Sequence, residues 1–174
     1  MDLKKADYGT VIEFGTMDDF TNKLNIESQN LSDVINNIDA RGISLLEKAL
    51  GSRKFDIAKY LLLEGAKVNV ISNEGFNELH FLAANINIEG GIEIAKLLIH
   101  HGVDLDHTDK KYKNTALFTV CLELLKRQTD EGMKLIEDLI SEHYNIDIVN
   151  KSGISVRTLL KERGTDRIKN LQTT

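Results

Sequence analysis

The stretch LLLEGAKVNVISNEGFNELHFLAA, residues 61–84, decides the fold. It opens on an apolar run that stops at Gly65, a residue able to adopt the left-handed conformation that ends many helices. A polar turn containing Gly75 follows, and a second apolar run begins just after Asn77. An asparagine directly before an apolar run is typical of a helix N-cap. The stretch therefore predicts a helix, a tight turn and a second helix.

The same pattern recurs on both sides of this stretch. Gly42 precedes Gly75 by 33 residues (75 − 42). Lys113 takes the place of the glycine 38 residues after Gly75 (113 − 75), and Gly153 restores it. A period of this length indicates a repeat architecture. We therefore predict one repeat domain over residues 1–174, divided into a degenerate N-terminal unit at 1–38, repeats at 39–71, 72–109 and 110–149, and a C-terminal capping unit at 150–174.

Each copy contains the residues that a stacked helix pair needs. A side chain able to accept a hydrogen bond from the first-turn amides opens every first helix: Ser44, Asn77, Thr115 and Ser155. Ser44 followed by Glu47 is also the pattern of a capping box. The second helices carry apolar stripes such as Ile57, Leu61 and Leu62. A lone helix pair has nothing to bury this stripe against, so successive copies are expected to stack.

Several fragments together resemble the ankyrin repeat: Leu79-His80, Thr115-Ala116-Leu117, and LLLEGAKVN at residues 61–69. The resemblance extends over roughly residues 36–171 and implies an all-α solenoid of antiparallel helix pairs joined by short β-hairpin-like turns. His80 occupies the consensus histidine position, for which the resemblance implies a structural hydrogen bond between repeats. The consensus proline is missing, because the chain contains no proline. The capping side chains are therefore expected to fix the helix starts without it.

Two copies are longer than the first. Matched positions in the second helices lie 37 residues apart from Ile57 to Ile94, and 41 residues apart from Ile94 to Leu135. Compared with a 33-residue period, this leaves about four and eight extra residues. We expect these insertions near residues 85–91 and 124–132, protruding at the helix ends opposite the hairpin turns.

Composition argues against several classes of protein. Lys and Arg number 22 against 27 Asp and Glu, so the net charge of −5 argues against a nucleic-acid-binding surface and favours a basic partner. No stretch approaches the roughly 20 apolar residues of a membrane span. The single cysteine, Cys121, excludes an internal disulfide. We therefore expect a cytoplasmic protein, monomeric when free, that binds neither nucleic acid nor membrane.

Residues with metal-binding or catalytic potential have simpler structural interpretations. His100, His101 and His107 lie among three aspartates, but a helix end followed by a hairpin directs successive side chains apart rather than toward one ion. Cys121 stands at an alanine position of the ankyrin consensus and is expected to be buried. No phosphate-binding or nucleophile motif occurs. We therefore predict no catalytic residue, no metal site and no cofactor, and an enzyme or metal protein is the least favoured alternative.

If the pairs stack, the hairpin tips and the exposed faces of the first helices form one long concave surface. Such a surface can bury the roughly 1,200–2,000 Å² of a stable protein interface. The candidate partner-binding residues are Arg41, Ile43, Asn73, Glu74, Phe76, Phe81, Lys111, Tyr112, Asn114 and Phe118. Arg41, Phe76 and Tyr112 are favoured because aromatic and arginine side chains dominate interface energetics. About half of the set is expected to face solvent.

The resemblance implies a protein that binds another protein. The element Asn-Thr-Ala-Leu at residues 114–117, in a small acidic chain, is similar to bacterial ankyrin proteins of the immunity type, which act on secreted toxins. A basic toxin domain is therefore one expected partner, since opposite charge raises association rates. The alternative is a regulatory or scaffold protein without an inhibitory role.

Overall fold

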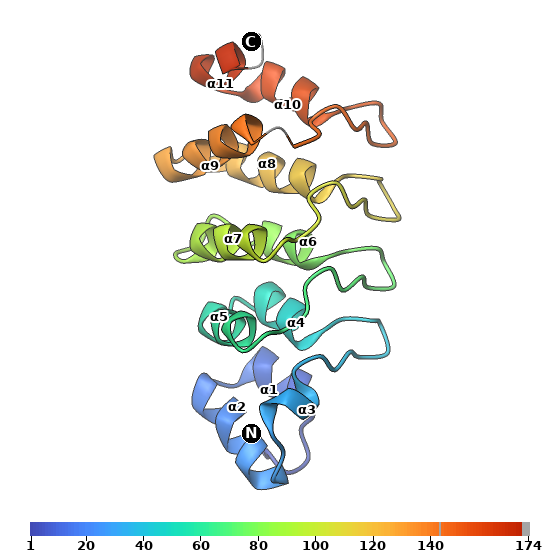
Figure 1. The fold of residues 1–174 in the computed structure, drawn as a ribbon, viewed down its shortest axis with the longest axis vertical. Helices are drawn as coiled ribbons and strands as arrows, with labels where there is room; N and C mark the ends of the chain where they lie inside the picture. The colour runs from blue at the N-terminus through green and yellow to red at the C-terminus, as the bar shows by residue number, and fades with distance from the viewer. Residues whose placement is uncertain (143, 172–174) are drawn as a thin grey trace.

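The computed structural model describes residues 1–142 and 144–171, which form helices stacked pair upon pair along one axis (Figure 1). The helices are α1 (Tyr8–Phe14), α2 (Met17–Glu27), α3 (Leu31–Val34), α4 (Leu45–Gly51), α5 (Phe55–Leu63), α6 (Glu78–Ala83), α7 (Gly91–His100), α8 (Ala116–Arg127), α9 (Asp130–Ser141), α10 (Val156–Arg163) and α11 (Asp166–Leu171). Over these described ranges, no helix is both long enough and apolar enough to cross a membrane.

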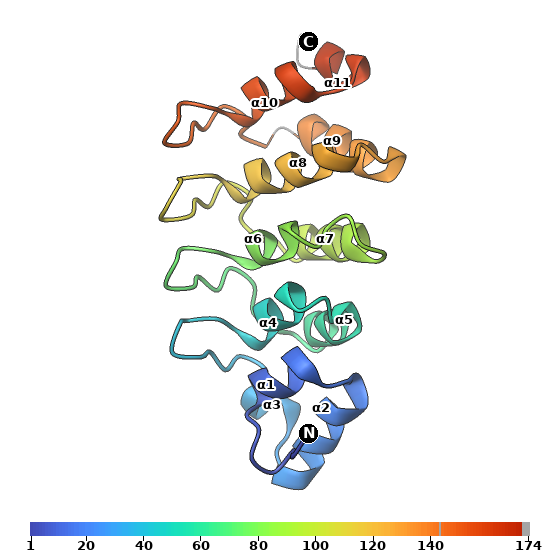
Figure 2. The same cartoon turned by 180° about the vertical axis from the view of Figure 1, so that it is seen from behind.

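The helices form two parallel stacks. The first helices α1, α4, α6, α8 and α10 contact one another in that order, and the second helices α5, α7, α9 and α11 do the same beside them. Hairpin turns project from one side of the stack at every level between α3 and α10 (Figure 2). Extended pairing in the described residues is limited to isolated bridges, Ile38 with Ser44 and Thr108 with Thr115. The predicted all-α ankyrin-repeat solenoid is confirmed.

All four predicted helix caps are confirmed. The side-chain oxygen of each capping residue accepts a hydrogen bond from a backbone amide three residues later, at Ser44, Asn77, Thr115 and Ser155. Ser44 also forms the predicted capping box, because its own amide donates to Glu47 Oε2 over 2.7 Å. Satisfying these first-turn amides contributes about 1 kcal/mol per helix, which compensates for the missing proline.

The core runs between the two stacks without interruption. Leu50, Leu61, Leu82 and Leu98 have no exposed surface. Burying each such side chain contributes on the order of 1.5–3 kcal/mol. The small residues of the first helices, Ala49, Ala83 and Cys121, are all at most 2% exposed. Each pair thus completes the core of its neighbour.

At the N-terminal end, helix α1 continues the stack of first helices. α1 begins at the cap Asp7, whose carboxylate accepts from the Thr10 amide over 2.7 Å, and packs against α2 and α4. Lys54, in the turn between α4 and α5, donates from Nζ to the Gly15 carbonyl over 2.7 Å. This contact ties the end of α1 to the first complete pair.

The two insertions lie opposite the hairpins but differ in structure. The first is a loop over residues 84–90 that connects α6 to α7. The expectation of a separate insert over residues 124–132 is wrong in detail, because residues 124–127 belong to α8 and residues 130–132 to α9. Both helices have 12 residues, against 7 in α4 and 9 in α5. Only Gln128 and Thr129 link them, so the extra residues lengthen the helices instead of forming a loop.

Candidate partner-binding surface

The hairpin turns share one local device. A side-chain oxygen at the start of each turn accepts hydrogen bonds from amides two to five residues later and so holds the turn closed. The residues that provide this oxygen are Asp39, Ser72, Asp109 and Asn150. Three turns place a glycine in the left-handed region, at Gly42, Gly75 and Gly153, and Lys113 adopts that conformation with φ 57° in the other. The backbone of every tip is therefore defined locally by its own sequence.

Adjacent hairpins are tied to one another by backbone hydrogen bonds. An amide at the tip of each hairpin donates to a carbonyl of the preceding one: Asn73 to Arg41 (2.8 Å), Lys110 to Glu74 (3.0 Å) and Lys151 to Tyr112 (2.9 Å). We call this series the tip ladder. The residues that form the ladder are all exposed.

The ten candidate residues fall into three classes of exposure. Five are exposed: Arg41, Asn73, Glu74, Lys111 and Tyr112. Three are half-buried: Phe76, Phe81 and Asn114. Two are buried and offer no surface for a partner, Ile43 (9% exposed) and Phe118 (6%).

The placement of the two buried residues corrects the expectation that they lie on the concave surface. Phe118 is in the first turn of α8, three residues after the cap Thr115, where its ring joins the core between the stacks. Ile43 directly precedes the cap Ser44, and its carbonyl accepts from the Asp39 amide over 2.9 Å, so the chain has already turned inward there. The expectation that about half of the set faces solvent is confirmed.

An aromatic group occupies the centre of the surface. The ring of Phe76 stacks on His80 with centroids 5.4 Å apart and meets Phe81 edge-on at 5.9 Å. Burial lowers the pKa of His80, which keeps the imidazole neutral. Its Nε2 then donates to the Asn114 carbonyl of the next repeat over 3.2 Å, which confirms the predicted inter-repeat bond. Phe76 is consequently part of a packed group, and its truncation would disturb stability as well as binding.

The other titratable residues do not assemble into a chemical site. His100 and His101 are exposed at the end of α7, and His107 Nε2 lies 3.0 Å from the Gly75 carbonyl. Within the described part of the chain, no three His, Cys, Asp or Glu side chains lie close enough together to hold a metal ion. Burial raises the pKa of the Cys121 thiol to about 12, so the unreactive protonated form prevails at neutral pH.

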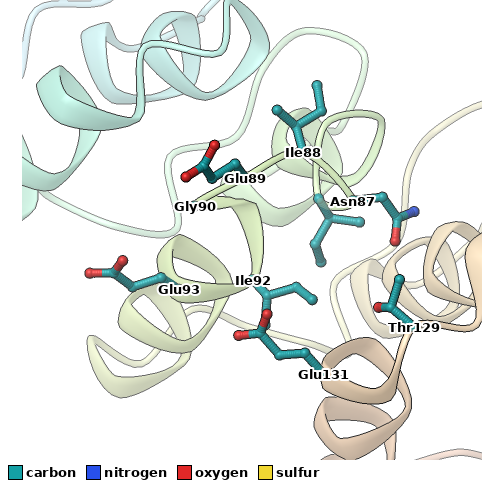
Figure 3. Close-up of a pocket in the computed structure, with 9 residues that line it drawn as sticks. Asn87, Ile88, Glu89, Gly90, Ile92, Glu93, Thr129 and Glu131 are labelled. Carbon is teal, nitrogen blue, oxygen red and sulfur yellow. The ribbon is translucent and has the colours of Figure 1, made fainter.

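A pocket of about 390 Å³ lies at the opposite end of the helices, between the 84–90 loop and the start of α9 (Figure 3). Its rim is acidic, with Glu89, Glu93 and Glu131. Lys59 pairs with Glu93 over 2.6 Å and lowers the pKa of that carboxyl. Asn87 spans to the next repeat by donating to the Glu123 carbonyl over 2.7 Å. The pocket therefore carries negative charge.

Positive charge gathers at the hairpin tips instead. Lys110, Lys111 and Lys113 are exposed residues of one tip, and Lys151 of the next hairpin joins them by donating from Nζ to the carbonyl of Lys111. Lys151 was absent from the predicted set. The signal was available in the sequence, because Lys151 follows Asn150 as Lys110 follows Asp109.

Comparison with known proteins agrees with the geometry. The profile of the ankyrin repeat family matches residues 74–110. An ankyrin repeat domain-containing protein of cowpox virus is 33% identical over 126 residues, which is 67% of this chain but 18% of that protein. Ankyrin repeat protein 14 of vaccinia virus is 32% identical over 126 residues, again 67% of this chain and 52% of the relative. The chain therefore spans about half of one relative and under a fifth of the other.

Proposed function

Because this chain is an ankyrin-repeat protein, we propose that it binds a partner protein on its concave face, through the hairpin tips and the aromatic group beside them. Ankyrin repeats are protein–protein interaction modules, and the partner of this chain is the open question. We further propose that it acts in the cytoplasm and is a monomer when free.

The tip ladder is the observation that carries the proposal. It aligns the hairpins on one side of the stack and leaves Arg41, Glu74, Lys111 and Tyr112 exposed there, although the core needs none of these side chains. A surface held in place by backbone bonds loses little conformational entropy on binding, which favours affinity. Tyr112, 55% exposed, is a typical anchor of such an interface.

A narrower role is the inhibition of a secreted toxin, as the resemblance to bacterial immunity proteins suggested. The poxviral relatives give this role no support. A regulatory or scaffold role fits the same surface and requires no toxin. The proposal therefore stops at partner binding, with inhibition as one outcome to be tested once the partner is known.

The test is affinity capture with three versions of the protein, each checked for cooperative unfolding. The first is the unchanged chain, the second carries Arg41→Ala and Tyr112→Ala, and the third carries Lys59→Ala and Lys134→Ala on the second-helix stack. We expect a protein that is retained by the first and third versions and lost from the second. Purified partner should then bind the double tip variant at least tenfold more weakly, about 1.4 kcal/mol.

Capture that is lost only with the Lys59 and Lys134 changes would overturn the proposal and move the interface to the convex side. Equal capture by all three folded versions would do the same. Tyr112 and Arg41 are suitable for this purpose because both are exposed and their loss leaves the core intact.

A further inference from the structure

The third and fourth hairpins carry a concentration of positive charge that the rest of this acidic chain does not share. We define the tip cluster as Lys110, Lys111, Lys113 and Lys151, all exposed, with Tyr112 among them. Over residues 1–142 and 144–171, no salt bridge joins any of these four lysines to a carboxylate. Most other lysines with contacts are paired, such as Lys59 with Glu93 and Lys134 with Asp138.

Two of the four ammonium groups are held in place by neutral partners. Lys110 Nζ donates to the carbonyl of Asn73 on the preceding hairpin over 2.9 Å. Lys151 Nζ donates to the carbonyls of Lys110, over 3.4 Å, and Lys111. Carbonyl groups orient an ammonium ion without neutralising it, so the positive charge stays in the cluster. The fold thus keeps like charges close together, an arrangement that an anionic ligand would relieve.

The acids near the cluster do not cancel its charge. Asp109 is buried beneath the tip, where it accepts from the amides of Tyr112 (2.6 Å) and Asn114 (2.9 Å). Glu74, exposed on the preceding hairpin, is the nearest acid on the surface that acts on Lys111. The Lys111 ammonium lies over the Tyr112 ring, 4.8 Å from its centroid. The Tyr112 side chain raises the pKa of Lys111, with smaller contributions from these two acids. Of the two acids that act on Lys111, only Glu74 is exposed.

We propose that the tip cluster binds an acidic segment of the partner protein, one that presents several Asp or Glu side chains around an apolar or aromatic residue. This inference rests on the proposed function and adds the chemical class of the contact. It also replaces the expectation of a basic partner at this end, because that expectation used the net charge of −5 and not its distribution. The negative charge gathers elsewhere, as around the pocket of Figure 3.

A protein segment fits the cluster better than a nucleic acid does. Nucleic acid presents a long row of phosphates, and the acidic remainder of the chain would repel the part that extends beyond two hairpins. A short acidic segment contacts the lysines alone. Tyr112 and Ile154, 55% and 37% exposed, lie on the two hairpins of the cluster and offer apolar contact for one side chain of that segment.

The main probe is a fluorescent 12-residue peptide of Glu and Asp with one central Leu, and its control is a neutral version with Gln and Asn. A single-stranded oligonucleotide of equal charge and vesicles with anionic lipid test the two other kinds of anionic ligand. Binding is measured by anisotropy, or by co-sedimentation for vesicles. We expect saturable binding of the acidic peptide, weakened at least tenfold between about 50 and 300 mM salt by screening. The neutral peptide should not bind.

Matched variants locate the site. Lys111→Glu with Lys113→Asn should weaken peptide binding at least tenfold, whereas Lys96→Glu with Lys134→Asn, the same change in net charge on the other stack, should leave it within twofold. Asn suits position 113 because it tolerates the left-handed conformation found there. Lys110 and Lys151 are left unchanged, since their loss would also loosen the ladder. Glu74→Gln should strengthen binding about twofold to threefold.

Equal weakening by both variants would mean that only net charge matters, and would overturn the inference. Tighter binding of the oligonucleotide or the vesicles than of the peptide would overturn it too. The inference and the proposed function can fail separately. A captured partner that still binds the Lys111 and Lys113 variant but is lost with Arg41→Ala and Tyr112→Ala would overturn the tip-cluster inference and leave the proposed function standing.

Discussion

Glu47 is a buried carboxyl at the junction of two repeats. Its side chain has no exposed surface, Oε2 accepts from the Ser44 amide, and Oε1 has no hydrogen-bond partner. Burial, with a contribution from the charge of Glu78, raises its pKa to about 8. The capping box is thus made with a protonated glutamic acid at neutral pH.

This pKa sets the sign of a pH dependence. The folded state holds a proton that the unfolded chain releases near pH 4.5, so the stability linked to Glu47 is fully present below about pH 4.5 and is lost as pH rises through about 8. We expect Glu47→Gln to match the unchanged protein at about pH 5 and to exceed it in urea midpoint at about pH 9. Exposed Glu64→Gln is the control. A variant less stable at the higher pH would contradict the assignment.

At this scale, the helix caps and the buried stripe of the second helices were predictable, whereas the burial of residues beside the caps was not. The four caps follow from residue type and position alone, because a cap bonds within its own turn. The burial of Ile43 and Phe118 depends on how the neighbouring repeat covers them, and short-range spacing carries no information about that contact. The same holds for Glu47, whose capping role was predicted but whose altered pKa arises from complete burial.

The 84–90 loop shows how an insertion is used at the level of elements. Asn85, 5% exposed, donates from Nδ2 to the carbonyls of Leu50 (3.1 Å) and Gly51 (3.0 Å) at the end of α4. Its Oδ1 accepts from Arg53 Nε over 2.9 Å. The loop therefore caps the C-terminal end of a helix in the preceding repeat. Sequence spacing located the insertion but gave no indication of this contact.

We expect Asn85→Ala to lower the unfolding free energy by about 1–3 kcal/mol, because two helix carbonyls and the Arg53 donor lose a buried partner. Urea denaturation followed by circular dichroism measures the change. Glu89→Gln, in the exposed part of the same loop, should remain within about 0.5 kcal/mol. Similar losses for both variants would show that the loop, and not the cap, determines the effect.

The structure of the extra residues in the third repeat differs most from what the spacing between repeats predicts. Leu124 and Leu125 are buried and continue the apolar face of α8, while Lys126 and Arg127 complement the negative end of its dipole. The prediction of a protruding insert here is wrong because it requires first helices of equal length in every repeat. The period gives the number of extra residues, but helix propensity and packing decide whether they coil or extend a helix.

Over the part of the chain that the structure describes, the extensive contacts between helices lie within one pair or between neighbouring pairs. Stability in such an array is a sum of contributions from the units and from the interfaces between them. A destabilising substitution in a terminal unit should therefore affect that end alone, whereas one in a central unit should affect the units on both sides. The fold as a whole was predictable for the same reason: each unit repeats a local pattern, and the overall shape follows from stacking.

Hydrogen exchange tests this locality. Ile168 in α11 and Leu98 in α7 both have no exposed surface. We expect Ile168→Ala to raise exchange in α10 and α11 while the amides of α4 to α7 keep their protection. Leu98→Ala, at a cost of about 2–5 kcal/mol, should raise exchange on both sides of α7. Uniform loss of protection in the Ile168 variant would mean that the array unfolds as one cooperative unit.

The tip ladder has a metric consequence. Since every hairpin is fastened to the one before it, the distance between successive tips equals the thickness of one helix layer, about 8–10 Å. The tips are therefore regularly spaced, and a ligand that spans several repeats has to carry its contact groups at the same spacing. Removing one complete layer would move every later tip by one interval, so that each later contact group of the ligand would meet the wrong tip, even though each tip kept its own shape.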